Sequence, residues 1–239
     1  MAQGMRILLL GLFGVLLGTP ASGEELVELF KQISPAVGAL YAQEQGGNLS
    51  FNCTVTIVEK TARTTILITA YHCATKDVAY AVTFDGRQFY SARVWKIPHD
   101  ELDKQKYPRH YGEPKTDMAF FLIDQVLPFP IVRLATTSVV DPGRRIATVG
   151  FPLGITKVRY EGLVSGRLDR PGDEQNGYLI LQVFGAPGSS GTAVVDVETG
   201  QVLGVLVSGT QGRIGLPVVF ATPIEYEKYL LEIPGYSKK

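Results

Sequence analysis

A serine between glycines lies late in the chain, in the segment Gly-Ser-Ser-Gly-Thr-Ala at residues 188–193. Glycine lacks a Cβ atom, so Gly188 and Gly191 can adopt backbone angles closed to other residues and let a carbonyl group approach main-chain N–H groups. A serine hydroxyl is a weak nucleophile at neutral pH unless a base lies within hydrogen-bond reach and a third group orients that base. The segment therefore predicts Ser190 as a nucleophile on a tight turn, if the chain supplies the other two groups.

The chain has only three histidines, and His72 follows the apolar run Ile-Leu-Ile-Thr-Ala at residues 66–70. This run predicts a strand, which would place His72 where a strand meets a loop. Asp117 directly precedes a second apolar run, at residues 118–123, which predicts a buried strand. A carboxylate beside a buried strand needs a partner, and an imidazole N–H is a suitable one. We therefore expect His72 to be the base and Asp117 the acid that orients it.

Other aspartates compete for the role of the acid. Asp100 and Asp103 lie in a charged, proline-bearing segment at residues 98–115, which has no buried strand to hold them. This segment predicts a solvated surface loop, and because it leads into Asp117 it could also border a substrate cleft. Asp124 lies at the far end of its strand and is a poor candidate.

The three segments resemble those of the chymotrypsin-like serine proteases, and the HtrA-type branch more than the digestive enzymes. In this family the histidine lies in a Thr-Ala-Ala-His-Cys-like segment, the aspartate begins an Asp-Ile-Ala-Leu-Leu-like strand, and the serine lies in Gly-Asn/Asp-Ser-Gly-Gly. Here His72, Asp117 and Ser190 follow in the same order. With further HtrA-like segments, such as Gly-Phe-Pro-Leu-Gly at residues 150–154, the resemblance covers about residues 33–226.

The remaining sequence predicts an all-β protein, because many short β-prone runs are separated by turn signals and no long helix interrupts them. The expected strands are residues 37–41, 49–58, 64–69, 78–84, 88–95 and 118–123, then 145–150, 158–167, 177–183, 192–197, 202–208 and 218–222. Together with the resemblance they predict two six-stranded antiparallel β-barrels, a chymotrypsin-like double barrel. The first barrel is expected over about residues 36–126 and the second over about 143–222.

Two short helices are expected outside the barrels. Apolar residues at helical spacing predict one helix at residues 24–32. Thr222 as N-cap, followed by a proline and then a glutamate three residues after the cap, predicts a C-terminal helix at about residues 223–231. We expect a single protease domain over residues 24–239, without an appended peptide-binding module.

Residues 1–23 have the pattern of a secretory signal peptide, in which Arg6 precedes an apolar stretch at residues 7–17 and small residues follow. About eleven apolar residues are fewer than the roughly 20 that a membrane-spanning helix needs. We expect export to the periplasm or the extracellular space, with cleavage near Gly23 and no lasting membrane association. The alternative is an uncleaved membrane anchor that extends to Leu26.

Two cysteines, Cys53 and Cys73, in an exported chain suggest a disulfide, and two buried free thiols are the alternative. In chymotrypsin-like proteases a bridge often ties the strand before the histidine loop to the residue after the histidine, and these positions match it. Such a loop closure would stabilise the fold by about 3 kcal/mol. We expect no metal, because two cysteines and one nearby histidine lack a fourth ligand, and no cofactor.

The resemblance also assigns residues around the nucleophile. The N–H groups of Gly188 and Ser190 would form the oxyanion hole. The residue before the nucleophile, Ser189, carries no charge, so it cannot pair with a new N-terminus as the aspartate of zymogen-activated relatives does. Activation by cleavage of the trypsin type is therefore not expected.

Substrate-binding residues are expected on both sides of the nucleophile turn. The resemblance places Phe184 in the specificity pocket, although it could equally be a core residue. Ser208, Gly209 and Thr210 would offer backbone groups to an extended substrate by β-augmentation. No carboxylate lies at the base of this pocket, which favours a small or medium apolar residue before the cut.

The sequence thus predicts an exported serine endopeptidase that acts on polypeptides through an acyl-enzyme intermediate. Lysine plus arginine equals aspartate plus glutamate, at 23 each, so no overall charge would attract nucleic acid. The alternative is a catalytically silent protease fold that serves as a binding module. An esterase on an α/β-hydrolase fold is excluded, because that fold places the serine before the acid and the histidine. HtrA-type relatives are often trimers, which makes a homo-oligomer through residues 24–32 a further expectation of the resemblance.

Overall fold

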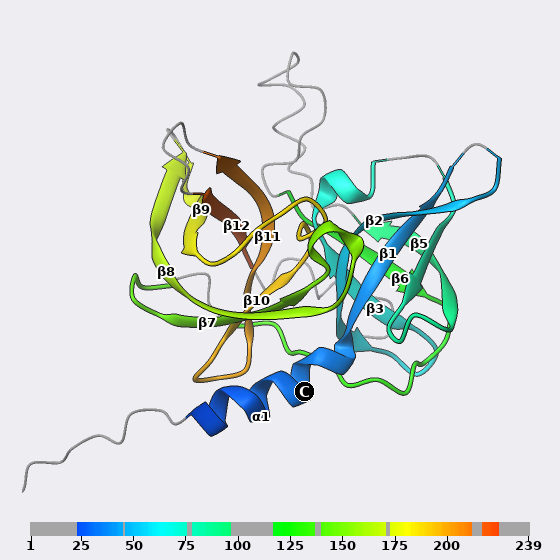
Figure 1. Cartoon of the computed structure of the whole chain (residues 1–239), viewed down its shortest axis with the longest axis horizontal. Coiled ribbons are helices and arrows are strands. Elements are labelled where there is room, and N and C mark those ends of the chain that lie inside the picture. Colours follow the sequence, from blue (N-terminus) through cyan, green and yellow to red (C-terminus); the bar gives the residue numbers. More distant parts are fainter. Residues whose placement is uncertain are drawn as a thin grey trace, which may run out of the picture.

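Two closed six-stranded antiparallel β-barrels, lying side by side, dominate the structure (Figure 1). It is a computed structural model, and it describes residues 23–44, 46–75, 78–96, 117–136, 140–170, 173–211 and 217–224. The predicted all-β double barrel is confirmed.

The first barrel closes in the order β1-β2-β3-β6-β5-β4. Its strands are β1 (Val37–Gln43), β2 (Leu49–Lys60), β3 (Thr65–Thr69), β4 (Tyr80–Thr83), β5 (Phe89–Lys96) and β6 (Ala119–Ile123). Every residue of β3 and β6 is buried, which explains why both strands read as continuous apolar runs in the sequence. These two strands anchor the segments that carry His72 and Asp117.

The second barrel closes in the order β10-β11-β12-β9-β8-β7. Its strands are β7 (Arg145–Gly150), β8 (Val158–Arg170), β9 (Asp173–Gln182), β10 (Ala193–Asp196), β11 (Val202–Gln211) and β12 (Pro217–Pro223). The β8–β9 pair is longer than the predicted strands, because Arg170 and Asp173 still pair across it. Backbone hydrogen bonding sustains the pair there, where the polar sequence gives no apolar signal.

One helix, α1 (Gly23–Ile33), precedes the barrels and is followed by the short 3₁₀ helix η1 (Ser34–Ala36). The predicted helix is confirmed, and it ends before Pro35, as expected from the steric restriction on residues that precede proline. Leu29 and Ile33 are buried in a core that includes residues of both barrels. Figure 1 shows α1, in blue, lying across one side of the two barrels.

Some expectations lie outside the described residues. These are the signal segment up to residue 22, the loop at 98–115, and residues 225–231 of the C-terminal helix expected at 223–231. The first two residues of that expected helix are described and are not helical, because Pro223 ends β12 and Ile224 follows it outside any helix. Within the described part of the chain, no helix has the length and apolar character that crossing a membrane would require.

Candidate active site

His72 and Asp117 are brought together by the pairing of two buried strands. Thr69, the last residue of β3, lies opposite Ala119, the first residue of β6. The chain that leaves β3 turns into the 3₁₀ helix η2 (Tyr71–Cys73), and the chain that enters β6 passes through Asp117. The antiparallel register therefore places two residues that are 45 positions apart in the sequence at the same end of the strand pair.

The Asp117 carboxylate contacts His72 at two points. Its Oδ2 lies 2.7 Å from His72 Nδ1, and its Oδ1 accepts a hydrogen bond from the His72 main-chain N–H at 3.0 Å. A carboxylate at Nδ1 accepts a hydrogen bond from the N–H of that nitrogen, which leaves Nε2 of the neutral ring without a proton and able to act as the acceptor. The Asp117 side chain is 22% exposed and the His72 side chain 46%, so the ring remains open to solvent. This arrangement can orient an imidazole as a base.

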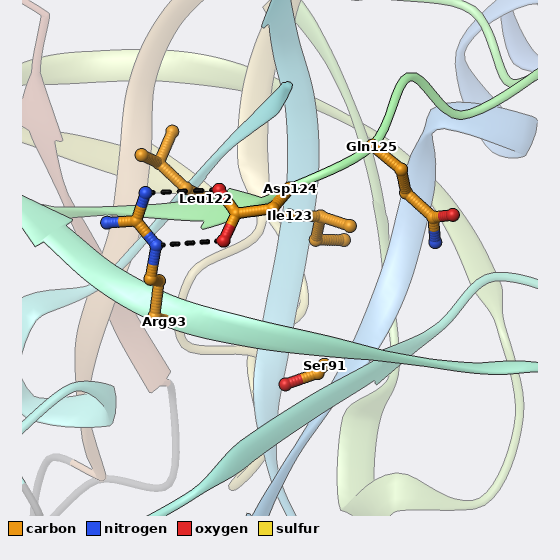
Figure 2. A pocket seen from close by; sticks show the side chains of 6 residues that line it. All are labelled: Ser91, Arg93, Leu122, Ile123, Asp124 and Gln125. Carbon is orange, nitrogen blue, oxygen red and sulfur yellow. Dashed lines mark hydrogen bonds and ion pairs between the residues drawn. The ribbon is translucent and has the colours of Figure 1, made fainter. Parts of the chain in front are cut away.

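Asp124, the rival aspartate that the structure describes, pairs with an arginine on the first barrel. The Asp124 carboxylate accepts hydrogen bonds from Arg93 Nε and Nη2, each at 3.1 Å (Figure 2). These bonds lower the pKa of Asp124 and raise that of Arg93. The pair borders an exposed hollow on the first barrel that contains no predicted site residue; its other lining residues are Ser91, Leu122, Ile123 and Gln125. Asp100 and Asp103 lie outside the described residues.

Two consecutive tight turns carry the predicted nucleophile. In the first, the N–H of Ser189 donates to the carbonyl of Ala186 at 2.9 Å, with Pro187 and Gly188 between them. Gly188 has a φ of +90°. Proline at the second position and glycine with positive φ at the third are the residues that a type II turn favours. The sequence Ala-Pro-Gly-Ser thus specifies the turn locally.

Ser190 lies on the second turn. There the N–H of Thr192 donates to the carbonyl of Ser189 at 3.1 Å, with Ser190 and Gly191 between them. Gly191 has a φ of +86°, and a Cβ atom at this position would lie 2.0 Å from the carbonyl oxygen of Thr54. Gly191 is therefore required for both its backbone conformation and its close approach to the first barrel.

The two turns contain five successive main-chain N–H groups, those of residues 188–192, and only some of them have hydrogen-bond acceptors among the described residues. The N–H groups of Ser189, Gly191 and Thr192 donate to backbone carbonyls at 2.9, 2.8 and 3.1 Å. Those of Gly188 and Ser190 have no acceptor in the part of the chain that the structure describes. These two are the groups that the sequence analysis expected to form an oxyanion hole.

Strand β2 links the serine turn to the histidine turn. Cys53 forms a disulfide with Cys73, the residue after His72, and the Cα atoms of the two cysteines are 6.1 Å apart. The next residue, Thr54, donates its main-chain N–H to the carbonyl of Ser190 at 2.9 Å. Ser190 Oγ itself makes no hydrogen bond to His72 among the contacts of the described residues. Nucleophile–base contacts are often long in a site without substrate.

The predicted disulfide is confirmed, and it determines whether the nearby sulfur and nitrogen atoms could bind a metal ion. One ligand atom each of Cys53, His72 and Cys73 lie within 4.8 Å of one another. Metal binding by cysteine requires a thiolate, and both sulfurs are bonded to each other here. This cluster therefore has a structural role, in that it ties the His72 turn to β2.

The predicted substrate-binding residues lie in the second barrel. The Phe184 side chain is 48% exposed and its ring lies against that of Tyr160, with the centroids 5.1 Å apart, so Phe184 is not a core residue. Ser208, Gly209 and Thr210 lie in β11 and pair with β12. β10 pairs with β11 only from Val202 to Val205. Leu206 still bonds to Thr192 and Gly191 of the serine turn, and beyond Leu206 the β10 side of β11 has no partner strand among the described strands.

Residues 53–205 match the trypsin-like peptidase domain family, which is more than half of the chain. The chain belongs to this family. Two solved structures of similar fold are those of the HtrA-type protease AlgW with tripeptide and of a variant of AlgW with tripeptide, each with a TM-score of 0.64. They are 20% and 19% identical to this trypsin-like peptidase. The expected family is thus confirmed, and the HtrA-type resemblance extends to the fold.

Each comparison with AlgW covers 86% of this chain and 62% of the AlgW chain. The trypsin-like peptidase chain therefore spans less than two thirds of the length of these two proteins.

One residue that contacts the serine turn, Thr54, was not predicted from the sequence. Its side chain is fully buried, and its Oγ1 donates to the carbonyl of Gly188 at 3.0 Å. Threonine is common in β-strands, so nothing in the sequence distinguished it from its neighbours. The only signal was its position directly after Cys53.

Proposed function

We propose that this trypsin-like peptidase is an active serine endopeptidase with His72, Asp117 and Ser190 as its catalytic triad. The observation that carries the proposal is the double contact of Asp117 with the ring and the main chain of His72. Family membership supports the same class of reaction. Cys53 is bonded to Cys73 beside His72, and the adjacent Thr54 donates its N–H to the carbonyl of Ser190, so the Ser190 turn and the His72 turn contact the same part of β2. This supports Ser190 as the third group of the triad.

The residues have separate roles in the proposed reaction. Ser190 Oγ attacks the carbonyl carbon of the peptide, and its proton passes to Nε2 of His72. Asp117 stabilises the resulting imidazolium, which then gives the proton to the leaving amine as the C–N bond breaks. A water molecule, deprotonated by His72 in the same way, hydrolyses the acyl-enzyme ester and releases Ser190.

The oxyanion that forms in each step requires donors that are already oriented. The N–H groups of Gly188 and Ser190 are free of other acceptors within the described residues, which supports their assignment. The N–H of Leu153 donates to the carbonyl of Pro187 at 2.7 Å. Since a trans peptide is planar, a carbonyl fixed toward Leu153 turns the Gly188 N–H of the same peptide to the opposite side. Loss of one oxyanion donor typically lowers the rate by about 10² to 10³.

We infer that the substrate is an extended polypeptide that adds to the free side of β11 beyond Leu206. The N–H of Gly191 donates to the carbonyl of Leu206 at 2.8 Å, so this side of the strand begins beside the Ser190 turn. The exposed ring of Phe184 and the half-buried ring of Tyr160 against it fit a small or medium apolar side chain before the cut better than a charged one. The disulfide is compatible with export of the protein, which we also propose.

Labelling with a fluorophosphonate probe tests the proposed triad directly. The purified chain, Ser190→Ala and His72→Ala are treated with the probe, and mass spectrometry locates the adduct. We expect label on Ser190 that is lost in both variants. Ser91→Ala, which removes an exposed serine of β5, is the control and should label like the wild type. A folded wild-type chain without label would contradict the proposal and favour a catalytically silent binding module.

A further inference from the structure

We propose that Thr54 of β2, in the first barrel, is a positioning residue for the two consecutive turns at residues 186–192 of the second barrel. These turns, which carry Gly188 and Ser190, are together called the oxyanion turn. The inference rests on the proposed function, since it concerns the turn that carries Gly188 and Ser190. Thr54 is fully buried and does not face the substrate. It acts through the main chain of these residues.

The Thr54 side chain uses its hydroxyl group as both donor and acceptor. Oγ1 donates to the carbonyl of Gly188 at 3.0 Å and accepts from the N–H of Phe151 at 3.1 Å. The main-chain N–H of Thr54 donates to the carbonyl of Ser190 at 2.9 Å, and its carbonyl accepts from Thr69 Oγ1 at 2.7 Å. One residue thus binds both turns and the segment that begins at Phe151.

The bond to Gly188 acts on the peptide that separates the two proposed oxyanion donors. The carbonyl of Gly188 belongs to the planar peptide between Gly188 and Ser189, while the donors are the N–H groups of the peptides before and after it. Glycine rotates freely about φ and ψ unless contacts restrain it. Fixing this carbonyl restrains ψ of Gly188, and with it the relative orientation of the two donors.

The surroundings of Thr54 leave little room for it to move. A Cβ atom at Gly150 would lie 3.4 Å from Thr54 Oγ1, and one at Gly191 would lie 2.0 Å from the Thr54 carbonyl oxygen. The preceding residue, Cys53, is bonded to Cys73 beside His72. The oxyanion turn is therefore held against the same short segment of β2 that holds the histidine turn.

Thr56 provides a matched control on the same strand. Like Thr54 it is fully buried, and its Oγ1 has no hydrogen-bond partner among the described residues. Replacing threonine by valine keeps the shape and removes the hydroxyl group at both positions. The two variants thus differ in whether the lost hydroxyl holds the oxyanion turn.

The experiment compares Thr54→Val, Thr54→Ser and Thr56→Val with the wild type. With a peptide substrate, we expect Thr54→Val to lower kcat by about 10- to 100-fold with little change in KM, less than the loss of a whole donor. Thr54→Ser, which keeps the hydroxyl group, should recover most of the wild-type rate. Thr56→Val should behave like the wild type. If Thr54→Val does not fold, Thr54→Ala removes the same hydroxyl with a smaller side chain.

Hydrogen exchange gives a readout that does not depend on activity. The amide groups of residues 186–192 should exchange faster in Thr54→Val than in the wild type, and Thr56→Val should leave them unchanged. Equal kcat and equal exchange in the two valine variants would overturn the inference. A wild-type chain that takes no probe would instead contradict the proposed function, and the exchange comparison would still decide whether Thr54 holds the turn.

Discussion

Asp117 interacts with His72 through both carboxylate oxygens, and these two interactions are chemically different. The contact of Oδ2 with Nδ1 sets the tautomer of the ring, whereas the bond from the His72 N–H to Oδ1 fixes the main chain of η2. An amide can replace the second interaction but not the first, because its NH₂ group would face Nδ1 as a donor. A single substitution can therefore separate catalysis from folding.

Asp117→Asn is expected to lower kcat/KM for a peptide substrate by about 10³ to 10⁴, because the ring would adopt the wrong tautomer. The circular dichroism spectrum and the midpoint of thermal unfolding should change little. Asp124→Asn, which breaks only the exposed pair with Arg93, is the control and should keep full activity. A loss of less than tenfold for Asp117→Asn would contradict the assigned role.

Gly191 combines a positive φ with a close approach to β2, and Gly143 allows the two effects to be separated. Gly143 has a φ of +89°, but a Cβ atom at this position would meet no atom within 4 Å beyond its chain neighbours. Gly143→Ala should lower the free energy of unfolding by about 1 to 2 kcal/mol, the usual cost of a left-handed residue. Gly191→Ala should lower the free energy of unfolding by at least about 3 kcal/mol, because the added methyl group overpacks against β2 in addition to straining the backbone.

Urea unfolding of the two alanine variants measures this difference. Equal losses at positions 143 and 191 would show that the second turn moves away from β2 at no cost.

At the scale of elements, β2 holds the candidate site together. Its residues Cys53 and Thr54 contact the histidine turn and the serine turn, which come from different barrels. The disulfide ties η2 covalently to β2. Since η2 has only three residues, it has few hydrogen bonds of its own with which to fix His72.

Removal of the disulfide should destabilise the fold and weaken catalysis together. The Cys53→Ala/Cys73→Ala variant is expected to lose about 3 kcal/mol of unfolding free energy, the value for closure of a loop of about 20 residues. Its kcat should also fall, because the His72 turn gains freedom. Dithiothreitol should have the same effect on the wild type and none on the variant. An unfolding midpoint that does not respond to either change would rule out this role of the bridge.

At the scale of the whole molecule, Lys157 links the second barrel to the first barrel and to the segment before it. It precedes β8 of the second barrel, and its Nζ donates to the carbonyl of Ser34 at 2.8 Å and to that of Phe84 at 3.3 Å. Nζ also lies 5.6 Å from the ring centroid of Phe151. Desolvation, and then the positive charge of Arg159, lowers the pKa of Lys157 to about 8.

This lowered pKa predicts how stability depends on pH. Below about pH 8 the charged, desolvated ammonium destabilises the folded state. Between about pH 8 and the ordinary value of 10.5, the unfolded chain binds a proton that the folded chain has lost, so this destabilisation is progressively relieved as pH rises. The unfolding free energy of the wild type minus that of Lys157→Met should therefore increase from pH 7.5 to pH 9.5. Lys31→Met, at an exposed position of α1, should show no such trend relative to the wild type. A flat difference for Lys157→Met would contradict the predicted titration.

The amino-acid sequence was sufficient to predict most of the strands and to single out the candidate residues, and the family resemblance added the grouping of the strands into two barrels. Continuous apolar runs such as those of β3 and β6 predict buried strands because burial depends on side-chain type. The glycines around Ser190 predict tight turns because they alone adopt positive φ without strain. These are local properties, and each can be read from a short segment.

Contacts between distant segments, in contrast, became known only from the folded chain. The register of β3 with β6 brings Asp117 to His72, and the packing of one barrel against the other brings Thr54 to Gly188, 134 residues away. The structure also resolved Phe184 as exposed, where the sequence left a core position open. Thr54 and Thr56 cannot be told apart in the sequence, since both are threonines of the same predicted strand. In the structure the hydroxyl of Thr54 binds a turn, whereas that of Thr56 has no partner among the described residues. Hydrogen bonds depend on which atoms meet in space, and the sequence of one segment does not contain that information.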